Sequence, residues 1–224
     1  MSGRASASLD AGRLPAGPVR VRPCVAADWP ALKQVRLAAL LDAPQAFGVS
    51  HAEALANPDS QWQARAAATG PARFFLAGQA GAADADADAD VDPDPDAIGM
   101  VAAVALDEGG PGGSSGPGGA GEAGRGGRLG LIAMWVSRPL RGIAVAGGGR
   151  VADLLIEAVQ AHAVAVGART LTLEVAPDNH RAVALYARHG FRFDAHVEAL
   201  ASDPTVKVQR MAWTVPAPAG ALSR

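Results

Sequence analysis

The sequence predicts an α/β fold in one domain, and three observations lead to it. A short strand pattern at residues 19–23 runs into a helical pattern at 28–41. Apolar, strand-like stretches then follow one another, and residues 150–215 alternate between strand and helix patterns. A meander followed by strand–helix–strand units is typical of an α/β domain.

Length and composition limit the size of the core, the class of protein and its possible binding partners. The chain has 224 residues, enough for one sizeable core, and it is 49% hydrophobic but only 4% aromatic. A net charge of -2 without a basic patch gives no electrostatic case for a nucleic-acid partner. The single cysteine, Cys24, excludes an internal disulfide framework and fits a reducing compartment. No apolar run approaches the roughly 20 residues that span a bilayer. We therefore expect a cytoplasmic protein with no membrane partner.

Two low-complexity insertions interrupt the domain. The first, at residues 79–97, carries Asp at every second position from Asp84 to Asp96. Repulsion between these charges favours a solvated loop. A calcium site is the alternative, because carboxylates suit hard cations, although the run lacks the glycine turn and closing Glu of an EF-hand. The second insertion, at 107–127, is rich in Gly, Ser and Pro and indicates a flexible linker between two strands.

The two ends of the chain are expected to be disordered. Residues 1–18 contain no apolar stretch, so they do not resemble a secretory signal. Residues 216–224 form a short tail. One domain is expected between them, over residues 19–215.

The N-terminal half is expected to form a strand, helices and a meander. The helix after residues 19–23 has Asp28 as its N-cap and Pro30 in its first turn. A second helix is expected near Ser50, with Trp62 in the segment that follows it. The apolar residues of the first helix at helical spacing are Leu32, Val35, Ala39 and Leu40.

Three strands follow, at residues 73–78, 98–106 and 128–137, and we expect them to be antiparallel. A clear helix begins at Arg150 and is capped by Gly167. Its apolar face is expected to hold Val151, Leu154, Leu155, Ala158 and Val159.

The last part of the chain alternates between strands and a helix. A strand is expected at residues 170–175, a helix at 178–190 that ends at Gly190, and final strands at 191–193 and 205–215.

Three stretches in this order resemble the GNAT superfamily of acyl-CoA-dependent N-acetyltransferases. They are MWVSRPLRG at residues 134–142, the helix from Arg150, and LTLEVAPDNHRAVALYARHGFR at 171–192. The stretch RLAALLDAPQAFGVSHAE at 36–53 looks like the acceptor-side opening of a large bacterial branch whose acceptor is unknown. The resemblance implies a mixed, mostly antiparallel central sheet flanked by helices. It also implies acetyl-CoA as co-substrate and no metal.

In this family an Arg/Gln-x-x-Gly-x-Gly/Ala turn at a helix N-terminus holds the pyrophosphate of acyl-CoA, because free amides and the helix dipole favour an anion there. The preceding strand hydrogen-bonds the pantetheine arm, which implies roles for Trp135 and Val136. One alignment places Arg150 and residues 148–152 at the end of the loop, after an insertion. The other matches the motif with Arg141, Gly142, Ala144 and Ala146, with Ala144 at the central glycine. Both alignments stay open.

The family also implies roles on the following strand and helix. Tyr186 matches the tyrosine that protonates the CoA thiolate, and Asn179 matches an asparagine that contacts the pantetheine or the surroundings of the tyrosine. Seven residues separate the two, which places them on one helix face. Glu174 resembles the glutamate of ribosomal-protein N-terminal acetyltransferases and is a candidate base acting through water. A core tyrosine and a salt-bridged strand carboxylate are the structural alternatives.

On the acceptor side, His51 and Glu53 are candidate substrate-binding residues. Arg36 on the first helix is a candidate contact for an acidic group of the substrate, and an exposed helix face is the preferred interpretation. The expected function is acetyl transfer to a primary amine by direct attack in a ternary complex. The acceptor is a small-molecule amine or a protein amine, and the protein a monomer or homodimer. One alternative is a non-catalytic relative that binds acyl-CoA or a partner. Another is that the acidic repeat recruits a basic partner.

Overall fold

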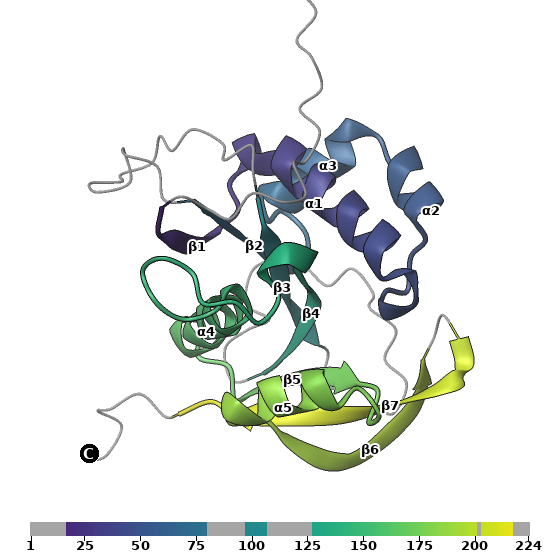
Figure 1. The fold of residues 1–224 in the computed structure, drawn as a ribbon. Helices are drawn as coiled ribbons and strands as arrows, with labels where there is room; N and C mark the ends of the chain where they lie inside the picture. The colour runs from purple at the N-terminus through teal and green to yellow at the C-terminus, as the bar shows by residue number, and fades with distance from the viewer. Residues whose placement is uncertain (1–16, 80–96, 107–126, 201–202, 217–224) are drawn as a thin grey trace, which may run out of the picture.

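The computed structural model describes residues 17–79, 97–106, 127–200 and 203–216, and helices cover both faces of one central sheet (Figure 1). The segments expected at the two ends of the chain and at the two insertions, the calcium site included, lie outside these ranges except at residues 17–18, 79, 97, 127 and 216.

Within the described ranges the sheet has seven strands, in the order β1-β2-β3-β4-β5-β7-β6. Neighbours pair antiparallel except for β4 and β5, which are parallel. The predicted α/β class, with a mixed and mostly antiparallel sheet, is therefore confirmed. The strands are β1 (Val19–Pro23), β2 (Ala72–Gln79), β3 (Gly99–Leu106), β4 (Arg128–Val136), β5 (Thr170–Val175), β6 (Arg192–Leu200) and β7 (Asp203–Thr214).

Two groups of helices pack on opposite faces of the sheet. Three of them, α1 (Trp29–Asp42), α2 (His51–Ala56) and α3 (Asp59–Ala66), share one core with side chains of β2, β3 and β4. On the other face lie α4 (Val151–Ala165) and α5 (His180–Arg188). Among the described residues, no helix is long and apolar enough to cross a membrane.

Alternation along β2 explains how one strand serves both cores. Phe75 and Ala77 are buried towards α4, whereas Phe74 and Leu76 pack towards α1 and α3. Successive side chains of a strand point to opposite faces, so a continuous apolar run fills both layers.

Asp28 occupies the N-cap position of α1, as predicted, but its side chain does not cap that helix. The Asp28 carboxylate makes no capping hydrogen bond to α1. It is fully buried, accepts a hydrogen bond from the Val25 amide at 2.8 Å, and binds the Arg22 guanidinium at 2.6 and 2.7 Å. Asp28 itself has helical backbone angles, so its side chain closes the preceding single turn, Ala26–Asp28, instead.

The other helices follow the sequence more closely. Ser50 is the N-cap of α2, and Trp62 is buried in α3. Gly167 follows α4 with a φ of +69°, as expected for a glycine at a helix C-terminus. The buried face of α4 is rotated relative to the prediction, because Leu154 and Ala158 are only partly buried. Its buried residues are Val151, Leu155, Ile156, Val159 and Ala163.

Candidate active site

The parallel strands β4 and β5 separate soon after they meet. They pair only from Arg128 to Gly130. On its other edge β4 shifts register against β3 at a β-bulge, where Ala133 has a φ of +58°. No described strand pairs with the β5 side of β4 beyond Gly130. The backbone there is therefore able to hydrogen-bond an extended polar ligand inserted between the two strands.

The loop between β4 and α4 folds out as a small hairpin. Ala144 and Arg150 pair as an isolated bridge, and the Val145 amide donates to the Gly149 carbonyl at 3.0 Å. The Ala146 carbonyl accepts from the Val19 amide of β1 at 3.2 Å, which ties the hairpin to the edge of the sheet. Each of the three consecutive glycines at 147–149 has a positive φ, so they allow the tight turn.

The helix α4 begins only after this hairpin. Arg150 is its N-cap, and the amides of Val151, Ala152 and Asp153 occupy its first turn. The residues at 144 and 146 do not lead directly into the helix. The helix start therefore coincides with the alignment that places Arg150 and residues 148–152 at the end of the loop.

An acidic residue in the first turn of α4 is neutralised from α5. Asp153 binds the Arg188 guanidinium at 3.0 Å and the His189 ring at 2.8 Å. Burial raises the pKa of Asp153, but the hydrogen bonds from His189 and Arg188 outweigh burial and lower it. The negative charge in the first turn of α4 is thus held in an ion pair with Arg188 of α5.

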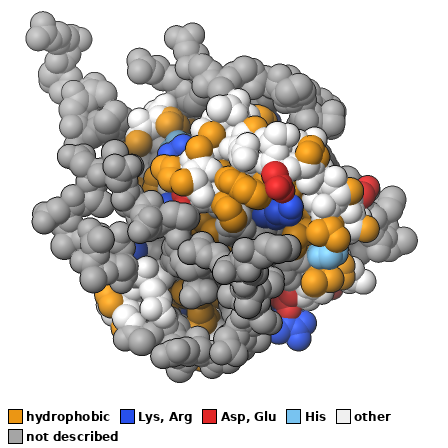
Figure 2. All heavy atoms as spheres, turned by 90° about the horizontal axis from the view of Figure 1, so that it is seen from above, with side chains coloured by type: hydrophobic (Ala, Val, Ile, Leu, Met, Phe, Trp, Pro, Cys, Tyr) orange, Lys and Arg blue, Asp and Glu red, His pale blue; other side chains and the backbone are white. Residues whose placement is uncertain are grey.

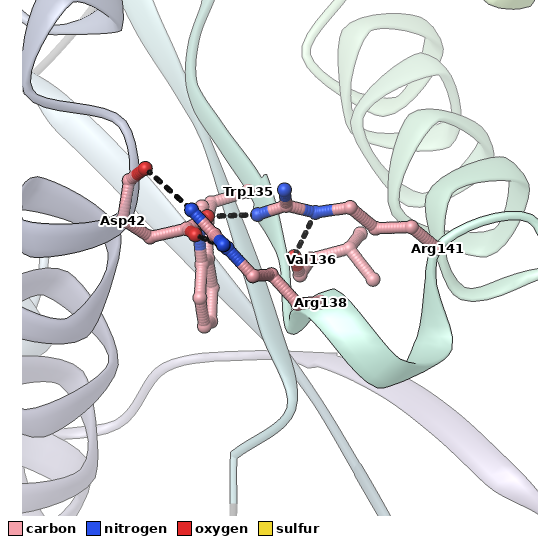
Figure 3. Close-up of polar contacts among 5 residues, drawn as sticks. All are labelled: Asp42, Trp135, Val136, Arg138 and Arg141. Carbon is pink, nitrogen blue, oxygen red and sulfur yellow. Dashed lines mark hydrogen bonds and ion pairs between the residues drawn. The ribbon is translucent and has the colours of Figure 1, made fainter. Parts of the chain in front are cut away.

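A carboxylate at the end of α1 binds three side chains at and just after the end of β4 (Figure 3). Asp42 accepts a hydrogen bond from Trp135 Nε1 at 2.9 Å and binds the guanidinium groups of Arg138 and Arg141. Arg141 Nε also donates to the Val136 carbonyl at 2.8 Å. Two of the predicted cofactor-binding residues, Trp135 and Arg141, therefore direct their polar groups at Asp42, which the sequence did not single out.

This network fixes the charge of Asp42. Burial raises the pKa of its carboxyl, but the hydrogen bonds from Trp135, Arg141 and Arg138 prevail and lower the pKa to about 2. The carboxylate is ionised at neutral pH, so it orients both arginines.

Helix α5 places Tyr186 in the core and Asn179 at the helix end. Tyr186 is 8% exposed, and its ring contacts that of Phe191 edge-on, with 5.8 Å between centroids. Burial raises its pKa to about 12. Asn179 is the N-cap of α5, and its side-chain oxygen accepts from the Ala182 amide at 3.2 Å. Asn179 is exposed and its carbonyl accepts from the Val183 amide at 3.0 Å, whereas Tyr186 is buried two turns further along the helix.

Gly142 brings the loop and α5 close together. It has a φ of +79°, and a Cβ at this position would lie 3.1 Å from an Arg181 guanidinium nitrogen. A glycine at 142 thus permits the first turn of α5 to approach the loop that follows β4.

Glu174 faces the opposite side of the sheet from its neighbours on β5. Leu173 and Val175 are buried in the core that contains Tyr186, whereas Glu174 is exposed and lies opposite Arg210 of β7 in register. The side chain therefore points towards the layer that contains α1 to α3.

Both predicted acceptor-side residues line a groove between the end of α1 and α2. Seen from above, hydrophobic side chains gather on this side of the molecule (Figure 2). The groove has a volume of about 480 Å³. Glu53 is also bound to Ser50, whose amide and hydroxyl donate at 2.8 and 2.7 Å, and these bonds lower the pKa of Glu53. The groove is lined by Leu40, Leu41, Pro44, Phe47, Gly48, Val49, Ser50, His51 and Glu53.

The assignment of Arg36 to an exposed helix face was wrong. Its guanidinium lies 4.4 Å from the centre of the Phe47 ring, and one of its nitrogens is buried. Residues 36–40 span one helical turn that ends at a groove residue, Leu40. Helical spacing alone could not reveal this, because the ring that covers Arg36 comes from the loop after α1.

Comparisons with known proteins concern the family and the fold. The model of the acetyltransferase (GNAT) family matches residues 82–191. Among solved structures, a GNAT-family acetyltransferase from Streptococcus pneumoniae is 14% identical, with a TM-score of 0.59, and the match covers 89% of this chain and 100% of that one.

Two further structures contain acetyl-CoA. They are yncA of Salmonella typhimurium, 13% identical with a TM-score of 0.58, and NAA60 of Arabidopsis thaliana, 17% identical with a TM-score of 0.55. The matches cover 91% and 88% of this chain and 97% and 99% of the other chains. No curated protein sequence matches this one. At these identities the structures establish a common fold.

Proposed function

The chain belongs to the acetyltransferase (GNAT) family, and on this premise we propose that it transfers acetyl from acetyl-CoA to a primary amine by direct attack in a ternary complex. The observation that carries the proposal is the separation of β4 from β5 beyond Gly130, beside the start of α4. The pantetheine arm, placed between the strands, would hydrogen-bond the backbone of residues 131–136.

The start of α4 supplies a site for the pyrophosphate. A helix N-terminus carries roughly half a positive charge, and its first amides have no acceptor within the helix. The amides of Val151 and Ala152 fit this role, since the Asp153 carboxylate is already paired with the Arg188 guanidinium and in hydrogen-bond contact with the His189 ring. Arg141 Nε donates a hydrogen bond to the Val136 carbonyl. In this proposal Arg141 therefore orients the end of β4 and does not bind the phosphate.

The two chemical roles fall on opposite faces of the sheet. The amine attacks the thioester carbonyl from the α1–α2 side, towards which Glu174 points. As the C–S bond breaks, the Tyr186 hydroxyl gives its proton to the thiolate and regains one released by the new amide nitrogen. With a pKa of about 12 Tyr186 keeps its proton at neutral pH, as a donor must. Glu174 accepts through water the proton that the ammonium form of the amine loses before it attacks, whereas the proton that returns to Tyr186 is the one that the nitrogen loses as the amide forms.

Isothermal titration with acetyl-CoA tests the proposal, with desulfo-CoA and adenosine 3′,5′-bisphosphate titrated alongside. The proposal expects micromolar binding of both CoA compounds, with weaker binding of the bisphosphate. In a screen of amines with acetyl-CoA, the proposal then expects the release of CoA with a free thiol. Binding without transfer to any amine would favour a non-catalytic CoA-binding protein. No binding at all would mean that the lengthened loop has lost the pyrophosphate site.

A further inference from the structure

The junction of α1 and α3 holds two buried hydrogen-bond donors that lack an acceptor among the described residues. They are a guanidinium nitrogen of Arg36 on α1 and Nε1 of Trp62 on α3. Both belong to side chains packed in or against the same apolar core. Buried donors are nearly always paired in proteins, because an unpaired one loses its hydrogen bonds to water without replacement.

A second cation lies at the same junction. Arg65 stacks on the Trp62 ring, with its guanidinium carbon 4.8 Å from the ring centre. Burial, and then the charge of Arg65, lower the pKa of Arg36 to about 10. Neither arginine has an acidic partner in the described part of the chain. By contrast Lys33, also on α1, pairs with Asp59 of α3 at 2.7 Å. Two like charges brought together without an anion are unfavourable unless a ligand supplies one.

This cationic junction shares one residue, Phe47, with the groove between α1 and α2, while Arg65 lines a second pocket beside β2. The Phe47 ring lines the groove and lies under the Arg36 guanidinium. The groove also contains His51 and the carboxylate of Glu53, which would repel a doubly charged phosphate more strongly than a singly charged anion. A carboxylate carries one charge and matches the planar fork of a guanidinium.

We infer that Arg36, supported by Arg65 and Trp62, binds a carboxylate of the acceptor, so that the acceptor class is an amine that also carries a carboxylate. This inference rests on the proposed function. It adds a specificity-determining residue, because Arg36 would distinguish acidic amines from neutral ones without taking part in the transfer itself.

The decisive experiment compares amines that differ only in the carboxylate. The twenty common L-amino acids and their carboxamides are offered with acetyl-CoA to the wild-type protein and to Arg36→Met, Arg36→Lys and Lys33→Gln. We expect a preferred acid to exceed its amide by about 10- to 100-fold in kcat/KM, since a hydrogen-bonded charge pair is lost with the amide. Arg36→Met should erase this preference with the KM for acetyl-CoA unchanged. Arg36→Lys should keep part of it, and Lys33→Gln all of it.

Thermal unfolding without amine separates binding from a structural role. If Arg36 is held for a ligand, Arg36→Met removes an unsatisfied charge, and its Tm should equal or exceed that of the wild type. A preferred acid should raise the Tm of the wild type but not that of Arg36→Met. A lower Tm of Arg36→Met together with an unchanged preference for acids would overturn the inference.

The failure of this inference can be told apart from the failure of the proposed function. Transfer to acids and amides at equal rates refutes the carboxylate site and leaves the acetyltransferase intact. Absence of both acetyl-CoA binding and transfer refutes the proposed function. The carboxylate site is then decided by the Tm shift alone: an acid-specific shift that requires Arg36 supports it, and no shift refutes it.

Discussion

Trp135 Nε1 donates a hydrogen bond of 2.9 Å to Oδ2 of Asp42 and so ties the end of β4 to the end of α1. The same carboxylate binds Arg138 and Arg141 from the loop that follows β4. One side chain on the acceptor side therefore orients the groups that surround the opened end of the sheet.

Replacing Asp42 by Ala should destabilise the fold and weaken acetyl-CoA binding. The change leaves the Trp135 donor without its acceptor and frees both arginines, at a cost of about 1–3 kcal/mol in the free energy of unfolding. Urea unfolding and titration with acetyl-CoA measure the two effects. Asp59→Ala removes the more exposed ion pair with Lys33 and is the control, with a cost of about 0–1 kcal/mol. Equal effects of the two substitutions would contradict the role given to Asp42.

The stabilisation by Asp42 should depend on pH in the acid range. Its pKa falls from the ordinary value of 3.8 to about 2 in the folded protein, so the unfolded chain binds its proton first as the pH drops. The difference in stability between the wild type and Asp42→Asn should be constant above about pH 5 and shrink as the pH falls towards about 2. Urea unfolding of both proteins at matched pH values tests this. A difference that stays constant down to pH 2 would show that the carboxylate charge is not involved.

Tyr186→Phe should lower kcat by about 100- to 10,000-fold, the usual contribution of a positioned proton donor. The ring and its contact with Phe191 remain, so desulfo-CoA should bind as tightly as to the wild type. Because the pKa of Tyr186 is about 12, the wild-type rate should show no loss from tyrosine ionisation below about pH 11. An unchanged kcat would leave Tyr186 as a core residue only.

Deleting residues 145–149 should leave a folded protein that still binds acetyl-CoA. The bridge between Ala144 and Arg150 already brings the two ends to a separation of about 5 Å between Cα atoms, close to the 3.8 Å of a peptide link. The loss of buried Val145 and of the contact with Val19 should cost about 1–3 kcal/mol. Titration with acetyl-CoA gives the answer. A folded variant that no longer binds would place the phosphate-binding amides in the hairpin instead of in α4.

Ala133→Gly should preserve or increase stability, whereas Ala133→Val should lower it. Ala133 has a φ of +58° in the bulge of β4, a conformation that costs a non-glycine residue about 1 kcal/mol or more and a β-branched one further. Thermal unfolding of both variants measures the difference. If the order of stability is reversed, the bulge is not strained by its side chain.

Local patterns were enough to predict most of the elements. The apolar spacing in α1 was confirmed by the burial of Leu32, Val35 and Leu40, and the alternation in β5 by that of Leu171 and Leu173. These predictions succeed because the period of side chains on a helix or strand is a local property. The capping box formed by Ser50 and Glu53 was equally readable and explains why a predicted substrate-binding residue also caps α2.

The sequence by itself determined the fold class, the order of the elements, the family and the position of Tyr186 on the helix after β5. Only the tertiary structure decided which charged residues meet. Asp42 reaches Trp135 and Arg141 across 93 and 99 positions of chain, and Arg36 is covered by Phe47 from a later loop. The tertiary structure also decided that the residues after Ala144 form a hairpin, which a hydrogen bond from β1 holds in place. Such contacts depend on how whole helices pack against the sheet, and no spacing of neighbouring residues encodes that packing.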